Sequence, residues 1–505
     1  MLVTNSILLD IPLFLLALLL LLYAYLSRNF KYWKRRGIPF FQPNILVGNF
    51  IDVLKFEKCP GEQVADFYRR CDGPYVGVFL VDKPVLLVKD LELARNVLVR
   101  DFHHFTDNAF ARRPGDISTF MLPFMRGDDW RMYKKFNTPA FSRSAVKSMY
   151  FASMIAAGEE LTEYIDNRLA DSSSKGLINC KKLGEMFSVD SVVSSVFGVK
   201  ANAFREENSI FRKMARGMFD YADLKRNFSI SAYILYPKLV DWLGLNLIDP
   251  AAEKLFKKEF FEIVRQKTNG ESNGDGLIDL LMKWRRDPSF REQYVDLDDD
   301  KMVAQAITFF LAAFEGTTSV ISFALYEMAK NPSIQERLRL EISQIPPDQN
   351  LFDYISDMTY LDMVFKETTR KYPPVPMFNR MCTSDYKVPG SSMVIEKGTT
   401  VFVSTLGIHN DPEYFPEPEL FDPERFSEAN VRKIKPGTFM PFADGGRSCM
   451  GQKFGTMSVK VALIKSLEHY RVSLRDDSQN VMKFNSQAYI ICPADDKVIL
   501  KFEKL

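Results

Sequence analysis

The chain has 505 residues, of which 46% are hydrophobic and 26% are charged. These fractions are those of an ordinary globular protein, so they exclude a disordered or fibrous chain. The 66 basic and 64 acidic residues leave a net charge of +2, which gives no argument for nucleic acid as a partner. Six scattered cysteines form no CxxC pair, so we expect a reducing compartment and no disulfide framework.

The first segment has the length and composition of a membrane anchor. From Ile7 to Leu26 it is almost wholly apolar, and about twenty such residues cross a bilayer. A cleaved signal peptide would need a basic start and a small-residue cleavage site, and neither is present. Basic residues follow the run, so the positive-inside rule places the remainder of the chain in the cytosol. We expect residues 1–27 to be a retained single-pass anchor and residues 28–44 to be a basic, proline-containing hinge.

Residues 45–505 are predicted to form one mainly α-helical domain with a smaller β-rich part. Two β-like runs, Tyr75–Val81 and Val85–Val88, predict strands separated by a turn around Lys83 and Pro84. No internal repeat or clean linker divides the domain.

One predicted helix is apolar nearly all round. The acidic run Asp296–Asp300 favours a helix start, because carboxylates are stabilised by the N-terminal dipole. From there we expect a helix of about thirty residues that ends before Pro332. Its stretch Ala306–Phe314 predicts that the helix is buried in the centre of the domain.

The most informative segment is the loop Pro441–Gly451, which reads PFADGGRSCMG. It has the form F-x-x-G-x-R-x-C-x-G and leads into an apolar helical run at Phe454–Leu467. Five fixed residues at this spacing are expected by chance in about one of 10,000 chains of this size. The loop resembles the signature of the cytochrome P450 family, haem-thiolate monooxygenases in which a cysteine thiolate holds the haem iron.

The resemblance implies that Cys449 ligates the iron. A thiolate is stabilised by N–H donors and positive potential, and a loop that enters a helix N-terminus supplies both. Gly451 lets the backbone approach a flat ring closely. Arg447 can bind a haem propionate through its fork of donors, and Phe442 can cover the sulfur and exclude water. The alternative for a lone cysteine, a small buried hydrophobe, is our interpretation of the other five.

Two further motifs predict a structural triad. The segment Glu367–Arg370 matches the family's E-x-x-R, but the pattern also occurs at four other places, which we interpret as solvated helix faces. What distinguishes this copy is its continuation KYPPVP. The segment Phe421–Phe426 contains the family's P-E-R-F. The resemblance implies that Arg425 joins Glu367 and Arg370 in a buried triad that holds the frame of the haem loop.

Three more residues are expected at the haem propionates. Trp130 opens the family's W-x-x-x-R, but Lys134 replaces the arginine and would bind as a point charge. Whether Lys134 or the neighbouring Arg131 binds the propionate stays open. Arg380 stands where related sequences place another propionate-binding arginine. The alternative for each cation is an ordinary surface position.

Oxygen chemistry in the family usually depends on an acid and an alcohol in the long helix. The chain reads AAFEGTT at Ala312–Thr318, against A-G-x-[DE]-T-[TS]. Glu315 matches the acid, but Gly316 occupies the alcohol position, and Thr317 lies about 100° further around the helix. We predict Glu315 and Thr317 as catalytic residues. A water beside Gly316 or a substrate hydroxyl are alternatives for delivering the proton.

The resemblance covers the whole chain and implies a cytochrome P450 fold with haem b as cofactor. The hinge and the segments Asp101–Phe105 and His409–Pro412 look most like insect microsomal members related to the vertebrate drug-metabolising group. The resemblance implies the endoplasmic-reticulum membrane as location, with a cytosolic catalytic domain. It also implies electrons from NADPH through cytochrome P450 reductase, with cytochrome b5 as an optional donor. The four histidines show no metal-ligand spacing, so we expect ordinary helix and loop roles for them.

The family's substrate segments predict a pocket for a lipophilic small molecule, without identifying one. These segments are Phe105–Phe124, Phe309–Thr317, Val375–Phe378 and Ser486–Ile490. Lysines near the cysteine-side face are candidates for docking an acidic reductase patch, with plain solvated side chains as the alternative. They are Lys134, Lys135, Lys433, Lys435 and Lys453.

Our leading interpretation is therefore a haem-thiolate monooxygenase, and two alternatives stay open. A reductase-independent hydroperoxide isomerase is favoured by the missing threonine at position 316 and opposed by the ordinary cysteine loop. A non-catalytic haem-binding protein is opposed by the retained Glu315, Arg447 and triad. Reductase-dependent NADPH consumption with product formation distinguishes the three.

Overall fold

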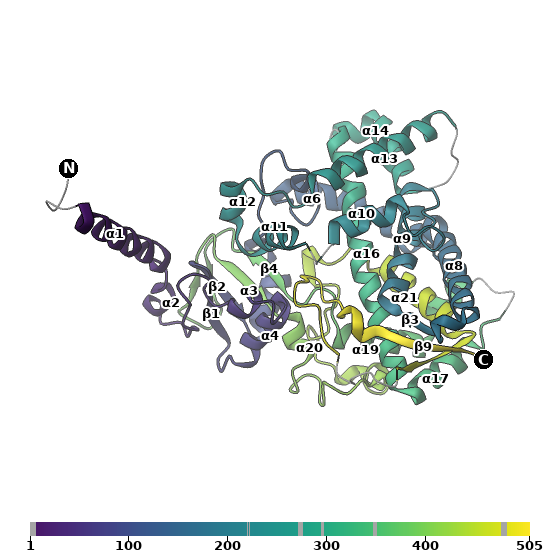
Figure 1. Ribbon diagram of the computed structural model, residues 1–505. Helices are drawn as coiled ribbons and strands as arrows, with labels where there is room; N and C mark the ends of the chain where they lie inside the picture. Colours follow the sequence, from purple (N-terminus) through teal and green to yellow (C-terminus); the bar gives the residue numbers. More distant parts are fainter. Residues whose placement is uncertain are drawn as a thin grey trace.

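The structure is a computed structural model, and it describes residues 7–219, 221, 223–270, 276–293, 297–346, 351–475 and 482–505. Residues 1–6 of the predicted anchor and Asp296 of the predicted helix start lie outside this part. Within it the fold is mainly helical with small sheets, as the sequence predicts (Figure 1). The α-helices are α1 Ile7–Ser27, α2 Tyr32–Arg35, α3 Ile51–Leu54, α4 Pro60–Arg69, α5 Leu91–Arg95, α6 Gly127–Asn137, α7 Arg143–Ala145, α8 Phe151–Ala170, α9 Cys180–Phe197, α10 Ile210–Phe219, α11 Leu224–Leu235, α12 Pro237–Leu243, α13 Pro250–Thr268, α14 Leu277–Arg286, α15 Pro288–Gln293, α16 Asp299–Lys330, α17 Pro332–Ile342, α18 Leu351–Asp357, α19 Thr359–Lys371, α20 Thr405–His409 and α21 Gln452–Leu467. The strands are β1 Tyr75–Leu80, β2 Lys83–Val88, β3 Leu177–Asn179, β4 Phe378–Met381, β5 Tyr386–Lys387, β6 Val394–Ile395, β7 Thr400–Val403, β8 Tyr470–Leu474 and β9 Ile499–Lys504.

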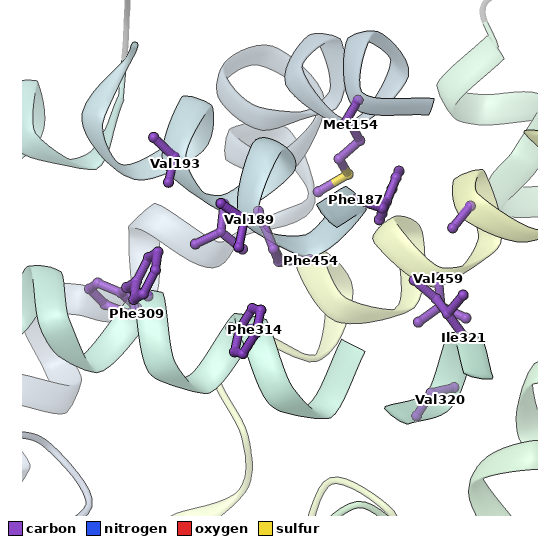
Figure 2. Close-up of a cluster of buried hydrophobic side chains, with 14 of the residues drawn as sticks. Met154, Phe187, Val189, Val193, Phe309, Phe314, Val320, Ile321, Phe454 and Val459 are labelled. Carbon is purple, nitrogen blue, oxygen red and sulfur yellow. The ribbon is translucent and has the colours of Figure 1, made fainter. Parts of the chain in front are cut away.

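The helix α16 runs through the centre of the body and organises the core. Asp298 accepts a hydrogen bond from the N–H of Lys301 and so caps its first turn. The helix packs against α9, α19 and α21 and is buried along most of its length. Figure 2 shows phenylalanines of α16 among valines of α9 and side chains of α21. This helix is long and apolar enough to cross a membrane, but its burial makes it the core helix.

The main sheet has the strand order β1-β2-β7-β4. The strands β1 and β2 pair antiparallel, and Leu80 opposes Lys83. The predicted turn around Lys83 and Pro84 is therefore wrong, because both residues belong to β2. The strand β7 pairs with β2 only from Val85 onward, so the missing N–H of Pro84 falls where no strand pairs on that side.

The N-terminal helix α1 projects from the body (Figure 1). Its leucines from Leu13 to Leu22 are each about half exposed or more, because no other element covers them. The segment that follows packs on the main sheet instead. Trp33 of α2 is buried, and its ring N–H donates to the carbonyl of Val78 at 3.3 Å. The body therefore gains packing from the segment after α1, but not from α1.

Candidate active site

A cavity of about 490 Å³ lies between α16 and the N-terminal end of α21. Its walls are mainly apolar, and all four predicted pocket segments contribute to them. The lining side chains from these segments are Asn108, Phe110, Leu122, Pro123, Phe309, Ala312, Ala313, Gly316, Thr317, Val375, Met377, Phe378, Tyr489 and Ile490. Sequence reasoning missed the contribution of α9, which adds Val192, Ser195 and Val196. The periodicity of α9 predicts burial, but not which cavity its side chains face.

Cys449 lies in the wall of this cavity, just before α21. Of the six cysteines, all within the described residues, it alone is open to the cavity, and the other five are buried. Its N–H donates to the carbonyl of Phe442 at 2.8 Å, which closes the loop. Burial raises the pKa of the Cys449 thiol, whereas the backbone N–H of Gly451 and the ammonium of Lys134 lower it. The loop thus provides a donor, and Lys134 on α6 provides positive charge, as a thiolate needs.

The loop before Cys449 requires glycine at two positions. Gly445 has φ +69°, and a Cβ there would overlap the carbonyl of Leu98. A Cβ on Gly446 would overlap the ring of Phe102. These close approaches explain why neither Gly445 nor Gly446 can be replaced by a residue with a side chain.

Arg447 anchors the wall of the cavity on the side of α6. Its Nε donates to the carbonyl of Thr106 at 2.8 Å, and one terminal nitrogen donates to Met125 at 2.8 Å. Its guanidinium carbon lies 4.0 Å from the centre of the Trp130 ring. The nearest carboxylate oxygen, on Asp107, is 3.7 Å away. Sequence reasoning missed Asp107, which also accepts from the N–H of Gly127 at 2.9 Å.

Lys134 and Arg380 bring two more cations to the same cavity. Lys134 donates to the carbonyl of Gly446, and Arg380 donates to Asn108 Oδ1 at 2.8 Å. The Nε of Arg380 is buried without a hydrogen-bond partner. Burial lowers the pKa of Arg380 to about 10, and burial together with Arg380 lowers that of Arg447 to about 9. An anion in the cavity would relieve both effects, so these residues fit the propionates of a haem.

Arg131, the alternative to Lys134, faces away from the cavity. It is about half exposed and pairs with Asp128 at 2.5 Å on the surface of α6. Trp130 and Lys134 are four residues apart and share one helix face, whereas Arg131 is turned by about 100°. Lys134 belongs to the cavity wall. Its place on a reductase-docking surface stays a prediction.

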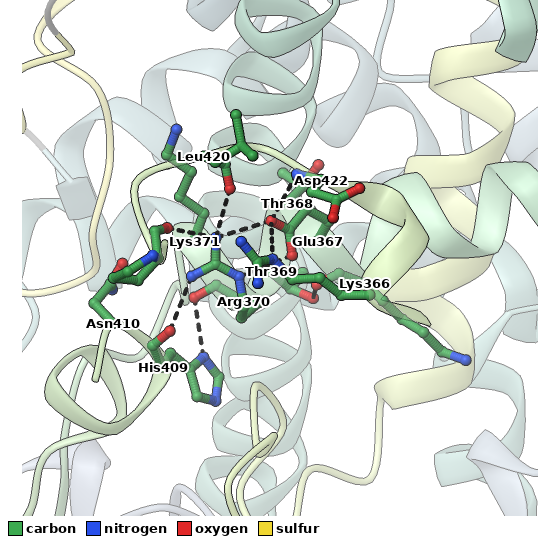
Figure 3. Close-up of polar contacts among 12 residues, drawn as sticks. Lys366, Glu367, Thr368, Thr369, Arg370, Lys371, His409, Asn410, Leu420 and Asp422 are labelled. Atoms are coloured by element: carbon green, nitrogen blue, oxygen red, sulfur yellow. Dashed lines mark hydrogen bonds and ion pairs between the residues drawn. The ribbon is translucent and has the colours of Figure 1, made fainter. Parts of the chain in front are cut away.

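The residues Glu367, Arg370 and Arg425 come together as the motifs predict. Glu367 and Arg370 are fully buried and form two hydrogen bonds of 2.8 and 2.9 Å. Arg425 Nε lies 3.4 Å from Glu367 Oε1, and the N–H of Asp422 donates to the same oxygen at 3.0 Å. Figure 3 shows Arg370 between Glu367 on α19 and His409 at the end of α20. The carboxylate is thus satisfied from three directions.

His409 connects this triad to the cysteine loop, a role that sequence reasoning missed. Arg370 donates to the His409 carbonyl at 2.9 Å, and the His409 ring accepts from the N–H of Met440 at 2.9 Å. Burial and the nearby Arg370 lower the pKa of His409 to about 3, so the ring is neutral. Met440 is next to the first residue of the loop Pro441–Gly451. The triad therefore reaches the loop through one neutral histidine.

The predicted acid and alcohol of α16 lie on different sides of the helix. Thr317 lines the cavity, as does Gly316, whereas Glu315 does not. Glu315 is buried and accepts a hydrogen bond from Tyr221 at 3.2 Å. Burial raises the pKa of Glu315 to about 7, with Lys181 opposing the shift. Glu315 and Thr317 are two residues apart, so they point about 200° apart around the helix. Their catalytic roles stay a prediction.

The raised pKa of Glu315 predicts a pH-dependent stability. In the unfolded state the Glu315 carboxyl loses its proton near its ordinary pKa of 4.5. In the folded state it keeps the proton until about pH 7. The free energy of unfolding should therefore fall as pH rises through this window. Glu315→Gln should flatten that fall and leave the variant more stable than wild type above about pH 7. Thermal unfolding midpoints of both proteins across the window check this, and parallel curves would contradict it.

The cavity combines a cysteine at a helix N-terminus with cations that can bind an anionic ligand. This combination defines the site of a haem-thiolate protein. A family model described as cytochrome P450 matches residues 38–500. Cytochrome P450 6k1 of Blattella germanica is 31% identical and covers 97% of this chain and 96% of its own length. Cytochrome P450 6a2 of Drosophila melanogaster is 32% identical, over 94% of this chain and 95% of the relative. Cytochrome P450 6A1 of Musca domestica is 32% identical, over 93% of each.

The chain belongs to the cytochrome P450 family. It is an oxidoreductase of the monooxygenase type, and its cofactor is haem held by a cysteine thiolate. The three relatives named above are insect proteins.

Proposed function

We propose that this monooxygenase inserts one oxygen atom of O2 into a lipophilic small molecule, a xenobiotic or an endogenous lipid or hormone. The observation that carries the proposal is the apolar cavity of about 490 Å³ beside Cys449. The same cavity also holds the haem, and its apolar walls suit a small molecule that is recognised by burial. We propose NADPH and cytochrome P450 reductase as the source of electrons, with cytochrome b5 as an optional donor. Residues 45–505 are proposed as the catalytic domain.

Cys449 is proposed as the residue that would hold the haem iron, with Phe442 and Gly451 beside the sulfur. Bound haem supplies the activation of dioxygen. The protein residues hold the sulfur as a thiolate, keep water from it, and orient the substrate. Phe442 supports this by stacking on Phe365, with ring centres 6.2 Å apart. The residues proposed to hold the propionates are Trp130, Lys134, Arg380 and Arg447.

Reductase-dependent product formation tests this function directly. NADPH, reductase and a panel of lipophilic substrates should give an oxygenated product and consume NADPH. Product formation from a hydroperoxide without reductase would instead support the isomerase, which the glycine at position 316 favours. Haem binding without either activity would support a carrier.

The glycine at position 316 predicts incomplete coupling. Glycine has no hydroxyl to deliver a proton at this point of the cavity wall. The wild-type enzyme should therefore release part of its reducing equivalents as hydrogen peroxide. A Cβ on Gly316 would meet its nearest neighbour, Pro374 Cβ, at 3.8 Å, so the site has room for a side chain. Gly316→Thr should therefore lower the peroxide formed per NADPH. Thr317→Val tests the neighbouring hydroxyl, since this change should loosen coupling if Thr317 delivers the proton. Unchanged coupling in both variants would contradict a role for this wall in proton delivery.

We propose that residues 1–27 anchor the enzyme in the endoplasmic-reticulum membrane, with the catalytic domain in the cytosol. The exposed leucines of α1 support this, since they would be buried in a bilayer. Residues 28–44 are proposed as the connecting hinge segment, which packs on β1 through Trp33.

Removing the anchor should leave the haem site intact. A chain that begins near Arg28 keeps Trp33 and its contact with Val78, so it should incorporate as much haem per protein as the full chain. Haem content measured in a detergent-free preparation checks this. Loss of haem on truncation would show that α1 is needed for folding as well as for anchoring.

A further inference from the structure

Several polar side chains of the cavity wall are already engaged within the protein. Ser195 and Thr308 each donate to the carbonyl one helical turn earlier, at 2.7 and 2.6 Å. The amide of Asn108 donates to the Pro123 carbonyl at 2.9 Å and accepts from Arg380 at 2.8 Å. A ligand that used one of these groups would have to break a hydrogen bond inside the protein, so they contribute little to its binding.

The hydroxyl of Tyr489 is different, because it has no hydrogen-bond partner in the part of the chain that the structure describes. Burial alone raises the pKa of Tyr489, and neither a charge nor a hydrogen bond contributes to the shift. Tyr489 lines the cavity and is only partly buried. The Oη of Tyr150 and the Nδ2 of Asn379 also lack a partner, but protein encloses both atoms. Tyr489 therefore offers a neutral O–H donor to a ligand in the cavity.

A closed turn carries Tyr489. The N–H of Asn485 donates to the Cys492 carbonyl at 2.9 Å, and the N–H of Ala488 donates to the Asn485 carbonyl at 3.1 Å. The side chain of Asn485 accepts from the N–H of Gln487 at 3.0 Å. Ala488, the neighbour of Tyr489, is fully buried. The backbone that carries the donor is thus fixed before a ligand arrives, which lowers the entropy that binding costs.

The same turn lies beside the wall that α16 forms. The N–H of Ile491 donates to the carbonyl of Pro374 at 2.9 Å. Pro374 is also the nearest neighbour of Gly316, at 3.8 Å between its Cβ and the position of a Cβ on the glycine. Gly316, Pro374 and Tyr489 all line the cavity. One small molecule can therefore contact the wall at Gly316 and the hydroxyl of Tyr489 at the same time.

We infer that Tyr489 selects substrates that carry a neutral oxygen acceptor, such as a carbonyl, on an otherwise apolar skeleton. This inference rests on the proposed function and narrows its substrate class from any lipophilic molecule to one with an acceptor for this hydroxyl. A ligand without an acceptor would leave the hydroxyl unpaired in an apolar cavity. One such hydrogen bond changes a binding constant by about three- to tenfold.

The test compares ligands that differ by one carbonyl, fluorenone against fluorene and benzophenone against diphenylmethane. The haem-loaded full chain is titrated with each, and binding is followed by the haem absorption spectrum. In Tyr489→Phe, the ratio of ketone affinity to hydrocarbon affinity should fall about three- to tenfold relative to wild type. A general change in packing would shift both members of a pair together and leave this ratio unchanged. Tyr150→Phe is the matched control and should keep the wild-type ratio, because protein encloses its Oη.

An unchanged ratio in Tyr489→Phe, or an equal fall in Tyr150→Phe, would overturn the inference. Failure of the proposed function is seen separately, because the titrations use neither NADPH nor reductase. A protein that shows the expected fall in the ratio but forms no oxygenated product would contradict the proposed reaction and support the inference. Binding of neither pair by the wild-type protein would contradict both.

Discussion

Replacing Arg370 with alanine is expected to lower the free energy of unfolding by about 3–5 kcal/mol. The change would leave the buried Glu367 carboxylate with Arg425 as its remaining cation, at 3.4 Å. It would also remove the donors to the carbonyls of His409 and Pro418. A buried charge without its partner is far costlier than a missing surface pair, so the effect should be large. Chemical or thermal unfolding of the haem-loaded protein measures it.

The chain carries a matched control for this prediction. Glu262 and Arg265 form the same E-x-x-R pattern and pair at 2.7 Å, but both are about half exposed. Arg265→Ala should therefore change the free energy of unfolding by less than about 1 kcal/mol. Similar losses in Arg370→Ala and Arg265→Ala would contradict a buried structural role for the triad.

Cys449→Ala should abolish NADPH-dependent product formation. The alanine removes the sulfur from the cavity wall, and no other cysteine opens onto that cavity among the described residues. Cys382→Ala is the control, because Cys382 is buried and its Sγ lies 2.9 Å from the Ser384 carbonyl. Product formation per haem in the two variants decides the assignment. Activity lost in Cys382→Ala and kept in Cys449→Ala would reverse it.

Local patterns in the sequence predicted the parts of the site that depend on neighbouring residues. The cysteine loop is a short segment in which the cysteine, the glycines and the following helix are all visible in order. The capped, apolar helix α16 is likewise a property of one continuous stretch. Helix periodicity also indicates that Lys134, and not Arg131, lies on the cavity side of its helix, since Lys134 shares a face with Trp130.

Features that depend on distant segments could not be predicted in the same way. Five copies of E-x-x-R look alike, and burial against the segment around Arg425 singles out one of them. The link from Arg370 through His409 to Met440 joins three segments that are apart in the chain. The turn predicted around Lys83 and Pro84 is wrong, because the sequence does not show where β7 begins to pair with β2. Glu315 accepts a hydrogen bond from Tyr221, which is distant in the chain, so the sequence does not show this contact.

The central claim is that Cys449 provides the thiolate that holds the haem iron. The most direct measurement is the absorption spectrum of the reduced carbon-monoxide complex of the full chain. We predict the red-shifted Soret band that thiolate ligation gives, present in wild type and in Cys382→Ala, and absent in Cys449→Ala. A wild-type protein that binds haem without this band, or a Cys449→Ala variant that keeps it, would contradict the assignment.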